Sequence, residues 1–281
     1  MAKEKIILAY SGGLDTSYCI PYLKESKDCD IVTVTVDTGG YASDELRAIE
    51  ERARSLGALK HRTIDARARV FDHYASYLIK GNVLRGDVYP LSVAAERVVQ
   101  AEVVAEVARE ENASAVAHGS TGAGNDQVRF DIAFAVLLPG VPVLTPIREQ
   151  NLSRDEEFLY LEERGVHLDK NVREYSINTG LWGATIGGGE THDSGTEIPE
   201  HLYDQTLRLQ GTTTTVTDTE KVRVGFDKGV PVSLDGKPLD GVSLVNQLGE
   251  LCRRHRVDFG QCPQGAQTHQ GFGVTEQGHQ R

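Results

Sequence analysis

The heptapeptide SGGLDTS at residues 11–17 constrains this chain more than any other segment. It follows the apolar run KIILAY at residues 5–10, which predicts a short strand, and a helix is expected to begin near Leu14. Its two adjacent glycines allow a tight turn and a close backbone approach to a ligand. Its serine and threonine hydroxyls can donate hydrogen bonds, and the amides at the start of a helix attract anions. The segment therefore predicts a phosphate cradle between a strand and a helix.

The type of cradle follows from what is missing after the glycines. No lysine follows them, so the segment is not the G-x-x-x-x-G-K-[ST] loop that grips β- and γ-phosphates. The pattern SGG-x-D-[ST] instead resembles the pyrophosphate loop of the ATP pyrophosphatases, which split ATP between its α- and β-phosphates. The alternative is an ordinary glycine-rich turn. The position of the motif directly after a first strand favours phosphate binding.

Length and composition are those of a globular protein. The 281 residues can form one large domain or two smaller ones, and 39% of them are hydrophobic and 25% charged. We expect no membrane span, because no run approaches the roughly 18 apolar residues that one needs. We also expect no signal peptide, because the chain enters a strand at once. A net charge of −11 argues against general binding to nucleic acid or to a membrane surface.

The cysteines indicate a reducing compartment. They form no close pair and no CxxC motif: Cys19, Cys29, Cys252 and Cys262. Reduced thiols and a cytoplasmic location are the simplest interpretation. The last two cysteines, with His255 and His269, could ligate zinc, but their spacing matches no standard site. We therefore predict no metal held by this chain alone.

Strands and helices alternate through the first half, which is typical of a parallel sheet covered by helices. The expected strands are residues 5–10, 30–36, 60–64, 113–117 and 141–145. The expected helices are residues 14–24, 43–56 (with Ser43 as N-cap and Gly57 as stop), 66–79, 91–110 and 125–137. Such sheets bind ligands at the carboxyl ends of their strands. The loops at 11–17, 37–40 and 119–125 are expected at that edge.

The pattern changes after Arg148, and a domain boundary is expected near residues 165–175. The expected elements are a helix at 153–164 capped by Ser153, an ordered glycine-rich loop at 175–191, a threonine-rich stretch at 212–219, a hairpin of strands 221–226 and 230–234 turning at 227–229, and a helix from 242 to 251. From Cys252 onward the chain is rich in Gln, Gly and His and has no period. We expect a disordered or poorly packed tail there.

A second polar constellation, HGSTGAGNDQVRFD, occupies residues 118–131. Its glycines allow close backbone approach, and Thr121 and Asn125 offer short hydrogen-bonding side chains. Asp126 can hold an ammonium or a hydroxyl, and Arg129 can fork onto a carboxylate. Asn125 and Arg129 are four residues apart and share a helix face. The alternative is a capped helix start with an Asp126–Arg129 surface pair.

Together, SGGLDTS and HGSTGAGNDQVRF closely resemble argininosuccinate synthase. The likeness extends through Tyr89, YSINTGLWG at 175–183 and GVSLVNQL at 241–248, and it covers about residues 4–251. It implies an α/β fold with a parallel-sheet nucleotide-binding domain, similar to the adenine nucleotide alpha hydrolases, at residues 1–168. It also implies an incomplete α+β synthetase domain at 169–251, followed by an atypical tail at 252–281.

The resemblance implies a two-step ligation in arginine biosynthesis. The ureido oxygen of citrulline attacks the α-phosphate of ATP and releases pyrophosphate, and the amine of aspartate then displaces AMP. ATP and Mg²⁺ are the implied cofactors, citrulline and aspartate the substrates, and a cytoplasmic homotetramer the family assembly. The enzyme's part is mostly positioning and charge stabilisation.

The resemblance also assigns roles to individual residues of this chain. It places ATP on Ala9, Tyr10, Ser11, Gly12, Gly13, Leu14, Asp15, Thr16 and Ser17, with Val36 lining the adenine pocket and Gly119 reaching the nucleotide. It places Asp15 near the pyrophosphate and its Mg²⁺, and it names Asp15, Asp126 and Arg129 as the catalytic set. It places aspartate on Thr121, Asn125 and Asp126, and citrulline on Tyr89, Asn125, Arg129 and Ser176. Thr185 stands where the family often has a serine.

Three departures from the family pattern bear on activity. Ala94 stands where a citrulline-binding serine is common, although Ser92 is close by, and Ala123 replaces a lysine common in the second loop. The likeness also ends near Leu251. The family continues with a glutamate and a tyrosine that bind citrulline and with a long helix that supports the tetramer. We therefore expect a truncated or frame-shifted end that lacks the helix supporting the tetramer, and ATP binding with weak or absent citrulline turnover.

Two other functions compete with this interpretation. One is another ATP pyrophosphatase, such as a tRNA-thiolating or amidating enzyme. Thiolation would need a placed cysteine pair and a basic face, and amidation would need an added glutaminase domain. The other is an inactive nucleotide-binding relative or regulatory subunit, which would bind ATP without citrulline-dependent release of pyrophosphate.

Overall fold

The computed structural model describes residues 3–86, 89–122, 125–166, 175–193, 195–197, 199, 201–202, 220–254 and 267–270. The chain divides into two compact units, and both are discontinuous in sequence. The first contains residues 1–70 and 94–176, and the second contains residues 71–93 and 177–281.

The first unit is built on a five-stranded parallel sheet in the order β3-β2-β1-β4-β5. Its strands are β1 (Lys5–Ala9), β2 (Asp30–Asp37), β3 (Lys60–Asp65), β4 (Ala115–Ala117) and β5 (Val143–Leu144). Ile7 of the central strand pairs with Val32 on one side and Val116 on the other. The strand order reverses between β1 and β4, so the loops after these two strands flank the point where such sheets bind ligands.

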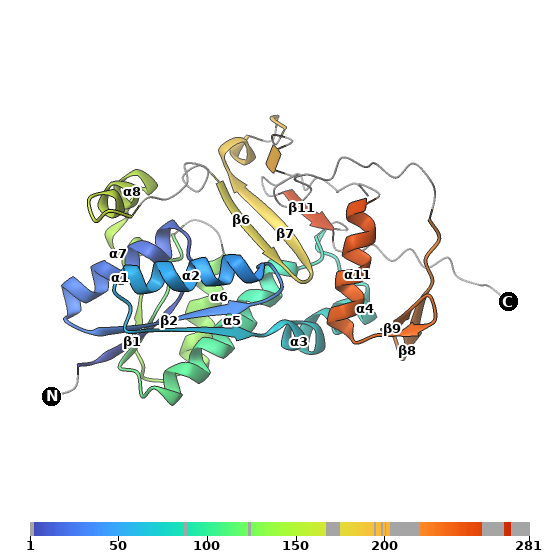
Figure 1. The fold of residues 1–281 in the computed structure, drawn as a ribbon, viewed down its shortest axis with the longest axis horizontal. Coiled ribbons are helices and arrows are strands. Elements are labelled where there is room, and N and C mark those ends of the chain that lie inside the picture. Colours follow the sequence, from blue (N-terminus) through green and yellow to red (C-terminus); the bar gives the residue numbers. More distant parts are fainter. Residues whose placement is uncertain are drawn as a thin grey trace. The chain divides into compact units, whose positions relative to one another are not determined.

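Helices cover both faces of this sheet, with α1 and α2 on one face and α5 and α6 on the other (Figure 1). They are α1 (Leu14–Lys27), α2 (Ser43–Ser55), α3 (Arg67–Val70), α5 (Ser92–Glu110), α6 (Asp126–Leu137), α7 (Pro146–Gln150) and α8 (Arg154–Glu162). Ile6 and Leu8 pack in one core cluster with buried residues of α1, α2, α7 and α8. Ile7 points to the opposite face and is also fully buried. Burial on both faces explains why β1 is a continuous apolar run.

The helix boundaries confirm some expectations and correct others. Helix α1 begins at Leu14 as predicted, and Gly57 follows α2 with a φ of +95°. Ser43, however, is the first helical residue of α2, and Ala42 is its N-cap. The Glu45 carboxylate accepts the Ala42 N–H at 2.5 Å and so satisfies the amide of the N-cap residue, but the side-chain cap expected from the Ser43 hydroxyl is not formed.

The expected helix at 66–79 is broken into three pieces. A π-helical segment η1 (Phe71–Ala75) separates α3 from α4 (Ser76–Gly81), and the boundary between the two compact units falls at its first residue. The expected strand at 141–145 is shorter, because Pro146 starts the unpredicted helix α7. Helix α8 confirms its predicted cap: the Glu156 N–H donates to Ser153 Oγ at 3.3 Å, and the Ser153 N–H donates to Glu156 Oε2 at 2.8 Å.

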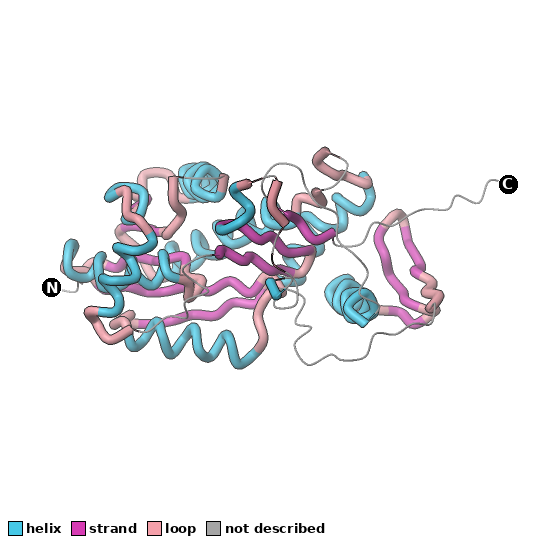
Figure 2. The backbone as a smooth tube through the Cα atoms, turned by 90° about the horizontal axis from the view of Figure 1, so that it is seen from above, coloured by secondary structure: helices cyan, strands magenta, loops and turns pink. Residues whose placement is uncertain are grey.

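The described part of the second unit consists of short antiparallel strands and helix α11. Its elements, besides η1 and α4, are β6 (Tyr175–Gly180, which starts in the first unit), β7 (Gly183–Gly188), η2 (Gly189–His192), β8 (Val224–Asp227), β9 (Val230–Leu234), β10 (Lys237–Pro238), α11 (Gly241–Arg254) and β11 (Gln267–Gln270). Figure 2 shows the hairpin of β8 and β9 beside α11. Lys228 and Gly229 turn this hairpin with φ of +49° and +78°, which confirms the predicted turn.

Two expectations for this unit need correction. Residues 175–191, predicted as a loop, form strands β6 and β7, because glycines at 180, 183 and 188 still permit a ladder between them. In the expected tail, residues 267–270 pair as strand β11 with β7. The rest of the chain from residue 255, and the threonine-rich stretch at 212–219, lie outside the described residues.

The described residues include no helix long and apolar enough to cross a membrane.

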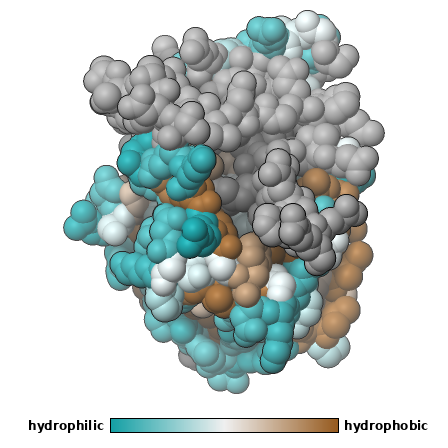
Figure 3. Space-filling model, turned by 90° about the vertical axis from the view of Figure 1, so that its right-hand side faces the viewer, coloured by the Kyte–Doolittle hydropathy of each residue, from teal (hydrophilic) through white to brown (hydrophobic). Residues whose placement is uncertain are grey.

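Some apolar side chains of the second unit are exposed to solvent. The hairpin segment exposes Val222, Phe226 and Val232 by 44%, 45% and 39%. Figure 3 shows brown apolar surface lying among hydrophilic residues on one face of the molecule.

Candidate functional site

The turn between β1 and α1 adopts the backbone that the sequence predicts. Gly12 has a φ of +75°, and a Cβ built on it would lie 2.7 Å from Ile49 Cγ1, so only glycine fits there without strain. Gly13 is the helix N-cap. The Ser17 N–H makes the first helical hydrogen bond, to the Gly13 carbonyl at 3.0 Å. The N–H groups of Leu14, Asp15 and Thr16 precede the first intrahelical donor, so they make no bond within the helix ladder and lie at the helix end that an anion cradle uses.

The three hydroxyls of the cradle have different surroundings. Ser11 is exposed, and its Oγ lies 3.2 Å from Thr16 Oγ1 and accepts the Gly13 N–H at 3.3 Å. Ser17 is fully buried, with its Oγ 3.3 Å from the Tyr10 hydroxyl. Ser11 and Thr16 can therefore contact a ligand, whereas Ser17 supports the turn from the core.

The backbone on both sides of the turn is held by neighbouring elements. Thr35 Oγ1 donates to the Tyr10 carbonyl at 2.7 Å, and the Arg52 guanidinium of α2 donates to the Gly12 carbonyl. Arg52 also brings a positive charge to the cradle, which the sequence gave no sign of. Val36 is buried near the carboxyl end of β2, the strand next to Ala9. This is the edge of the sheet at which an adenine pocket was predicted.

Asp15, in the first turn of α1, lies beside two charged residues of α8. Arg154 Nη1 is 3.6 Å from Asp15 Oδ1, and Glu157 is completely buried. Burial raises the pKa of Asp15 against the opposing charge of Arg154. Burial, and then the charge of Asp15, raises the pKa of Glu157 to about 8. Each of the two carboxyls is therefore harder to ionise than usual while the other lies close by.

The loop after β4 is seated directly against this cradle. A Cβ built on Gly119 would lie 3.1 Å from the Thr16 N and from the backbone carbon of Asp15. The predicted nucleotide-contact residue of the second loop and the first turn of α1 therefore touch. Two segments more than a hundred positions apart in the sequence form one site.

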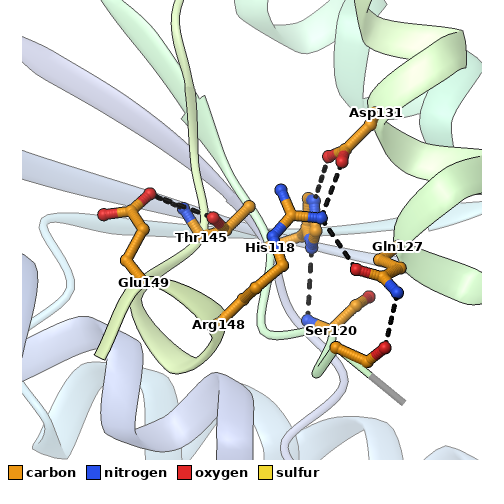
Figure 4. Close-up of polar contacts among 8 residues, drawn as sticks. His118, Ser120, Gln127, Asp131, Thr145, Arg148 and Glu149 are labelled. Carbon is orange, nitrogen blue, oxygen red and sulfur yellow. Dashed lines mark hydrogen bonds and ion pairs between the residues drawn. The ribbon is translucent and has the colours of Figure 1, made fainter. Parts of the chain in front are cut away.

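A series of polar contacts connects the second loop to α6 and α7 (Figure 4). The Ser120 N–H donates to His118 Nδ1 at 3.2 Å, and His118 Nε2 lies 2.9 Å from Asp131 Oδ1. Arg148 Nη1 donates to Asp131 Oδ2 at 2.7 Å and to Gln127 Oε1 at 2.9 Å. Gln127 Nε2 in turn donates to the Gly122 carbonyl at 2.7 Å.

Asp126 is held by two arginines. Arg129 Nη1 donates to Asp126 Oδ1 at 2.6 Å, and Arg97 Nε of α5 donates to Asp126 Oδ2 at 2.9 Å. The Asp126–Arg129 pair that the sequence allowed as an alternative is thus present. Asn125 is the N-cap rather than the first helical residue, and the Arg129 N–H donates to its carbonyl at 3.2 Å. A carboxylate ligand would therefore compete with Asp126 for Arg129.

A hollow of about 280 Å³ lies beside the second loop. Its lining includes Thr121 and Gly122 of the loop and Arg148 of α7 (the other lining residues are Ile147, Asn151 and Leu152). Thr121 was predicted from the family pattern to bind aspartate. The volume is at the lower limit of small-molecule pockets.

The other predicted site residues belong to other elements of the chain. Tyr89 pairs with Arg85 through backbone hydrogen bonds at 2.8 and 3.1 Å, and Thr185 is a half-buried residue of β7. Both belong to the second compact unit. Ser176 is the second residue of β6. Ala94 and Ser92 both belong to α5, where Ser92 is fully buried, and Ala123 lies outside the described residues.

Sequence reasoning missed the residues that support the site. Arg52, Arg97, His118, Asp131, Arg148 and Glu157 were assigned no role. Only His118 and Asp131 carried a usable signal, because they begin and end the second motif. The others come from helices distant in sequence, and no local pattern connects them to the loops they contact.

The fold and the site together define a class. A parallel sheet with a glycine turn and helix N-terminus after its central strand, and a second loop after the neighbouring strand, is the architecture of HUP-type nucleotide-binding proteins with a pyrophosphate loop.

Comparison with known families confirms this class and narrows it. The family described as arginosuccinate synthase N-terminal HUP domain matches residues 5–167, and the arginosuccinate synthase C-terminal domain matches residues 175–259. This chain belongs to the argininosuccinate synthase family.

Curated relatives agree along most of the chain. The argininosuccinate synthase of Sulfolobus acidocaldarius is 42% identical over 88% of this chain and 61% of its own length. Those of Saccharolobus solfataricus and Thermosynechococcus vestitus are each 44% identical, over 87% and 91% of this chain and 60% and 64% of their lengths. The chain thus spans about three fifths of the length of these relatives. The solved U34-tRNA thiolase NcsA from Methanococcus maripaludis is 16% identical over 60% of each chain, with a TM-score of 0.41.

Proposed function

We propose that this chain catalyses the ATP-dependent ligation of citrulline and aspartate to argininosuccinate, with AMP and pyrophosphate as the other products. The observation that carries the proposal is the contact between Gly119 and the first turn of α1, which unites the two motif segments in one site. Family membership supports the choice of reaction over other uses of the same cradle. ATP use is implied by the family itself.

The cradle suits the first half of this reaction. The free amides of α1 and the hydroxyls of Ser11 and Thr16 would hold the outer two phosphates of ATP. The ureido oxygen of citrulline would form a bond to the α-phosphorus while the bond from that phosphorus to pyrophosphate breaks. In the second half, the amine of aspartate would attack the activated ureido carbon, lose a proton and release AMP. The residues supply positioning and charge stabilisation.

Mg²⁺ fits this site as a partner of the phosphates. Magnesium is usually held by one or two carboxylates together with substrate phosphates, and Asp15 is a partly exposed carboxylate at the cradle. When bound, the ion would neutralise part of the phosphate charge. Arg52 and the α1 N-terminus would supply further positive potential from the protein.

The second loop and α6 suit the amino-acid substrates. Thr121, Asn125 and Asp126 would hold aspartate, with Asp126 facing its ammonium group. Arg129 would fork onto the carboxylate of citrulline together with Asn125, after partial release from Asp126. Tyr89, Ser176 and Thr185 would complete the citrulline contacts.

The proposal extends to organisation and setting. We assign residues 1–168 to the nucleotide-binding domain and 169–251 to part of the synthetase domain. We expect a cytoplasmic protein whose partners are citrulline and aspartate rather than nucleic acid or membrane, and the homo-oligomer is proposed for the family rather than for this chain. Buried free Cys19 and Cys29 support a reducing compartment.

The test is the release of labelled pyrophosphate from ATP with and without citrulline. Citrulline-dependent release, followed by aspartate-dependent formation of AMP and argininosuccinate, is the expected result. ATP binding without any such release would instead identify a nucleotide-binding relative. Sizing chromatography of the same preparation would report its assembly.

A further inference from the structure

The loop at residues 119–122 is tied to the body of the first unit at two points. One is the bond from the Ser120 N–H to His118 Nδ1, and the other is the bond from Gln127 to the Gly122 carbonyl. Both ties lead to Arg148, because Arg148 contacts Gln127 directly and reaches His118 through Asp131. The loop therefore completes a closed circuit of hydrogen bonds that runs through α6, α7 and His118, the residue directly after β4 (Figure 4).

The contacts of His118 determine which of its nitrogens carries a proton. Nδ1 accepts the Ser120 N–H, so it must be unprotonated. Nε2 must then carry the hydrogen and donate it to Asp131 Oδ1. The ring is only 1% exposed and stacks on Phe130 at a centroid distance of 5.3 Å, so it has little freedom to turn. The hydrogen bond from the Ser120 N–H to His118 thus requires the neutral imidazole with its hydrogen on Nε2.

We propose that His118 is a positioning residue that holds the loop at 119–122 against the first turn of α1 through its unprotonated Nδ1. Through that loop it sets the affinity of the site for nucleotide. Gly119 is the link, because it lies so close to the first turn of α1 that a Cβ built on it would be only 3.1 Å from the Thr16 N. The inference rests only on the nucleotide-binding part of the proposed function, and it assigns a role to a residue that contacts no substrate itself.

This arrangement makes the loop sensitive to acid. A second proton on His118 would reside on Nδ1 and point at the Ser120 N–H, so the loop would lose its tie. Three charged groups act on the ring: Asp131 and Asp126 of α6 favour the protonated form, and Arg148 of α7 opposes it. Burial outweighs them and lowers the pKa of His118 below its ordinary value. The loop is therefore expected to stay seated at neutral pH and to loosen only in acid.

Two substitutions of His118 distinguish the bond at Nδ1 from the bond at Nε2. In His118→Asn the amide oxygen can occupy the place of Nδ1 and keep the Ser120 bond, while the bond to Asp131 is lost. In His118→Gln the amide nitrogen can occupy the place of Nε2 and keep the Asp131 bond, while the Ser120 bond is lost. The matched controls are His61→Asn and His61→Gln. His61 is another buried histidine of the first unit, and it contacts Thr33 and Thr63 rather than the loop.

The first readout is amide hydrogen exchange at Ser120, measured without nucleotide. We expect His118→Gln to lose protection there, His118→Asn to keep it, and both His61 variants to resemble the wild type. Lowering the pH should reduce Ser120 protection in the wild type, after correction for intrinsic exchange, and not in His118→Asn. Equal protection of Ser120 in His118→Gln and the wild type would overturn the proposal. Thermal unfolding of each variant identifies any that merely fails to fold.

The second readout is binding of a non-hydrolysable ATP analogue, measured by calorimetry. We expect His118→Gln to bind it about threefold to tenfold more weakly, in line with one lost hydrogen bond, and His118→Asn to bind nearly as the wild type does. Equal weakening in both variants would overturn the proposal, because it would mean that the Asp131 contact matters as much. If the wild type itself binds no analogue, the proposed function fails, and Ser120 exchange still decides whether His118 holds the loop.

Discussion

Gly119 and Thr16 are in contact across the phosphate cradle: a Cβ added to Gly119 would lie 3.1 Å from the Thr16 N and equally close to its Cγ2. The backbone of the second loop thus packs on the first helical turn of the first motif. A Cβ at this distance would be tighter than nearly all real Cβ contacts, so a side chain here would force the loop or the helix to shift.

The first prediction concerns this contact. Gly119→Ala should push the loop away from α1 by a few tenths of an ångström and weaken binding of an ATP analogue by about tenfold, because the proposed function places the loop and the turn before α1 on the same nucleotide. Gly122→Ala is the matched control in the same loop, since nothing lies within 4 Å of a Cβ built there. Calorimetric titration of both variants is the measurement. Similar losses in the two variants would contradict the prediction.

The second prediction concerns the glycine turn. Gly12→Ala should lower the free energy of unfolding by about 1–3 kcal/mol, because alanine is strained at a φ of +75° and would contact Ile49. Gly13→Ala should cost less, since Gly13 has a φ of −76° and the nearest atom to its built Cβ is Ser11 Oγ at 3.4 Å. Denaturant unfolding compares the two. A Gly13→Ala variant that is the less stable would contradict this view of the turn.

The third prediction concerns the Asp15–Glu157 pair. The pKa of Glu157 rises from 4.5 to about 8 on folding, so the folded protein holds a proton that the unfolded chain releases in this window. Stability is therefore expected to fall as the pH rises from about 5 through about 8. Glu157→Gln should remove much of that slope, and Glu162→Gln, on the exposed side of the same helix, should not. Thermal unfolding between pH 5 and 9 in the absence of divalent ions gives the answer, and parallel profiles for all three proteins would refute it.

The fourth prediction concerns Arg97, which is 12% exposed and bonds Asp126 from α5. Arg97→Met should raise the KM for aspartate by about tenfold, because a charge-assisted bond that positions Asp126 is lost, and should leave ATP binding nearly unchanged. Arg69→Met is the control: it removes an exposed pair between Arg69 and Glu106, which is expected to matter little. Steady-state kinetics with each substrate varied separates these outcomes. A rise in the KM for ATP alone would be inconsistent with the role given to Asp126.

The parts of the fold that could be predicted are those whose signal is local. The apolar run of β1, the glycine turn, the Ser153 cap and the hairpin turn at Lys228 each depend on neighbouring residues, and all are present. The strands at 175–188 were missed because their glycines hide the two-residue period that marks a strand. The π-helical break at Phe71 has no local signal either, because residues 66–79 keep a helical composition across it.

The candidate site divides in the same way. Its backbone elements lie within two short motifs, so the sequence alone predicts the cradle and the second loop. The groups that set their charge and position, such as Arg52, Arg148 and Glu157, come from other helices and become neighbours only in the folded chain. The predicted roles of all the site residues in binding ATP, citrulline and aspartate stay predictions.

The interrupted course of the chain through its two units has a consequence for synthesis. Residues 71–93 emerge from the ribosome well before residues 177–281, with which they are grouped, and α5 and β4 follow them. These residues are thus synthesised before β4 and β5, the two strands that complete the sheet on the side of β1 opposite β2. A fragment that stops at residue 93 would keep β2 but lack β4, the other neighbour of β1, and the loop that follows β4. The nucleotide-binding unit therefore cannot be produced by ending the chain at its first boundary.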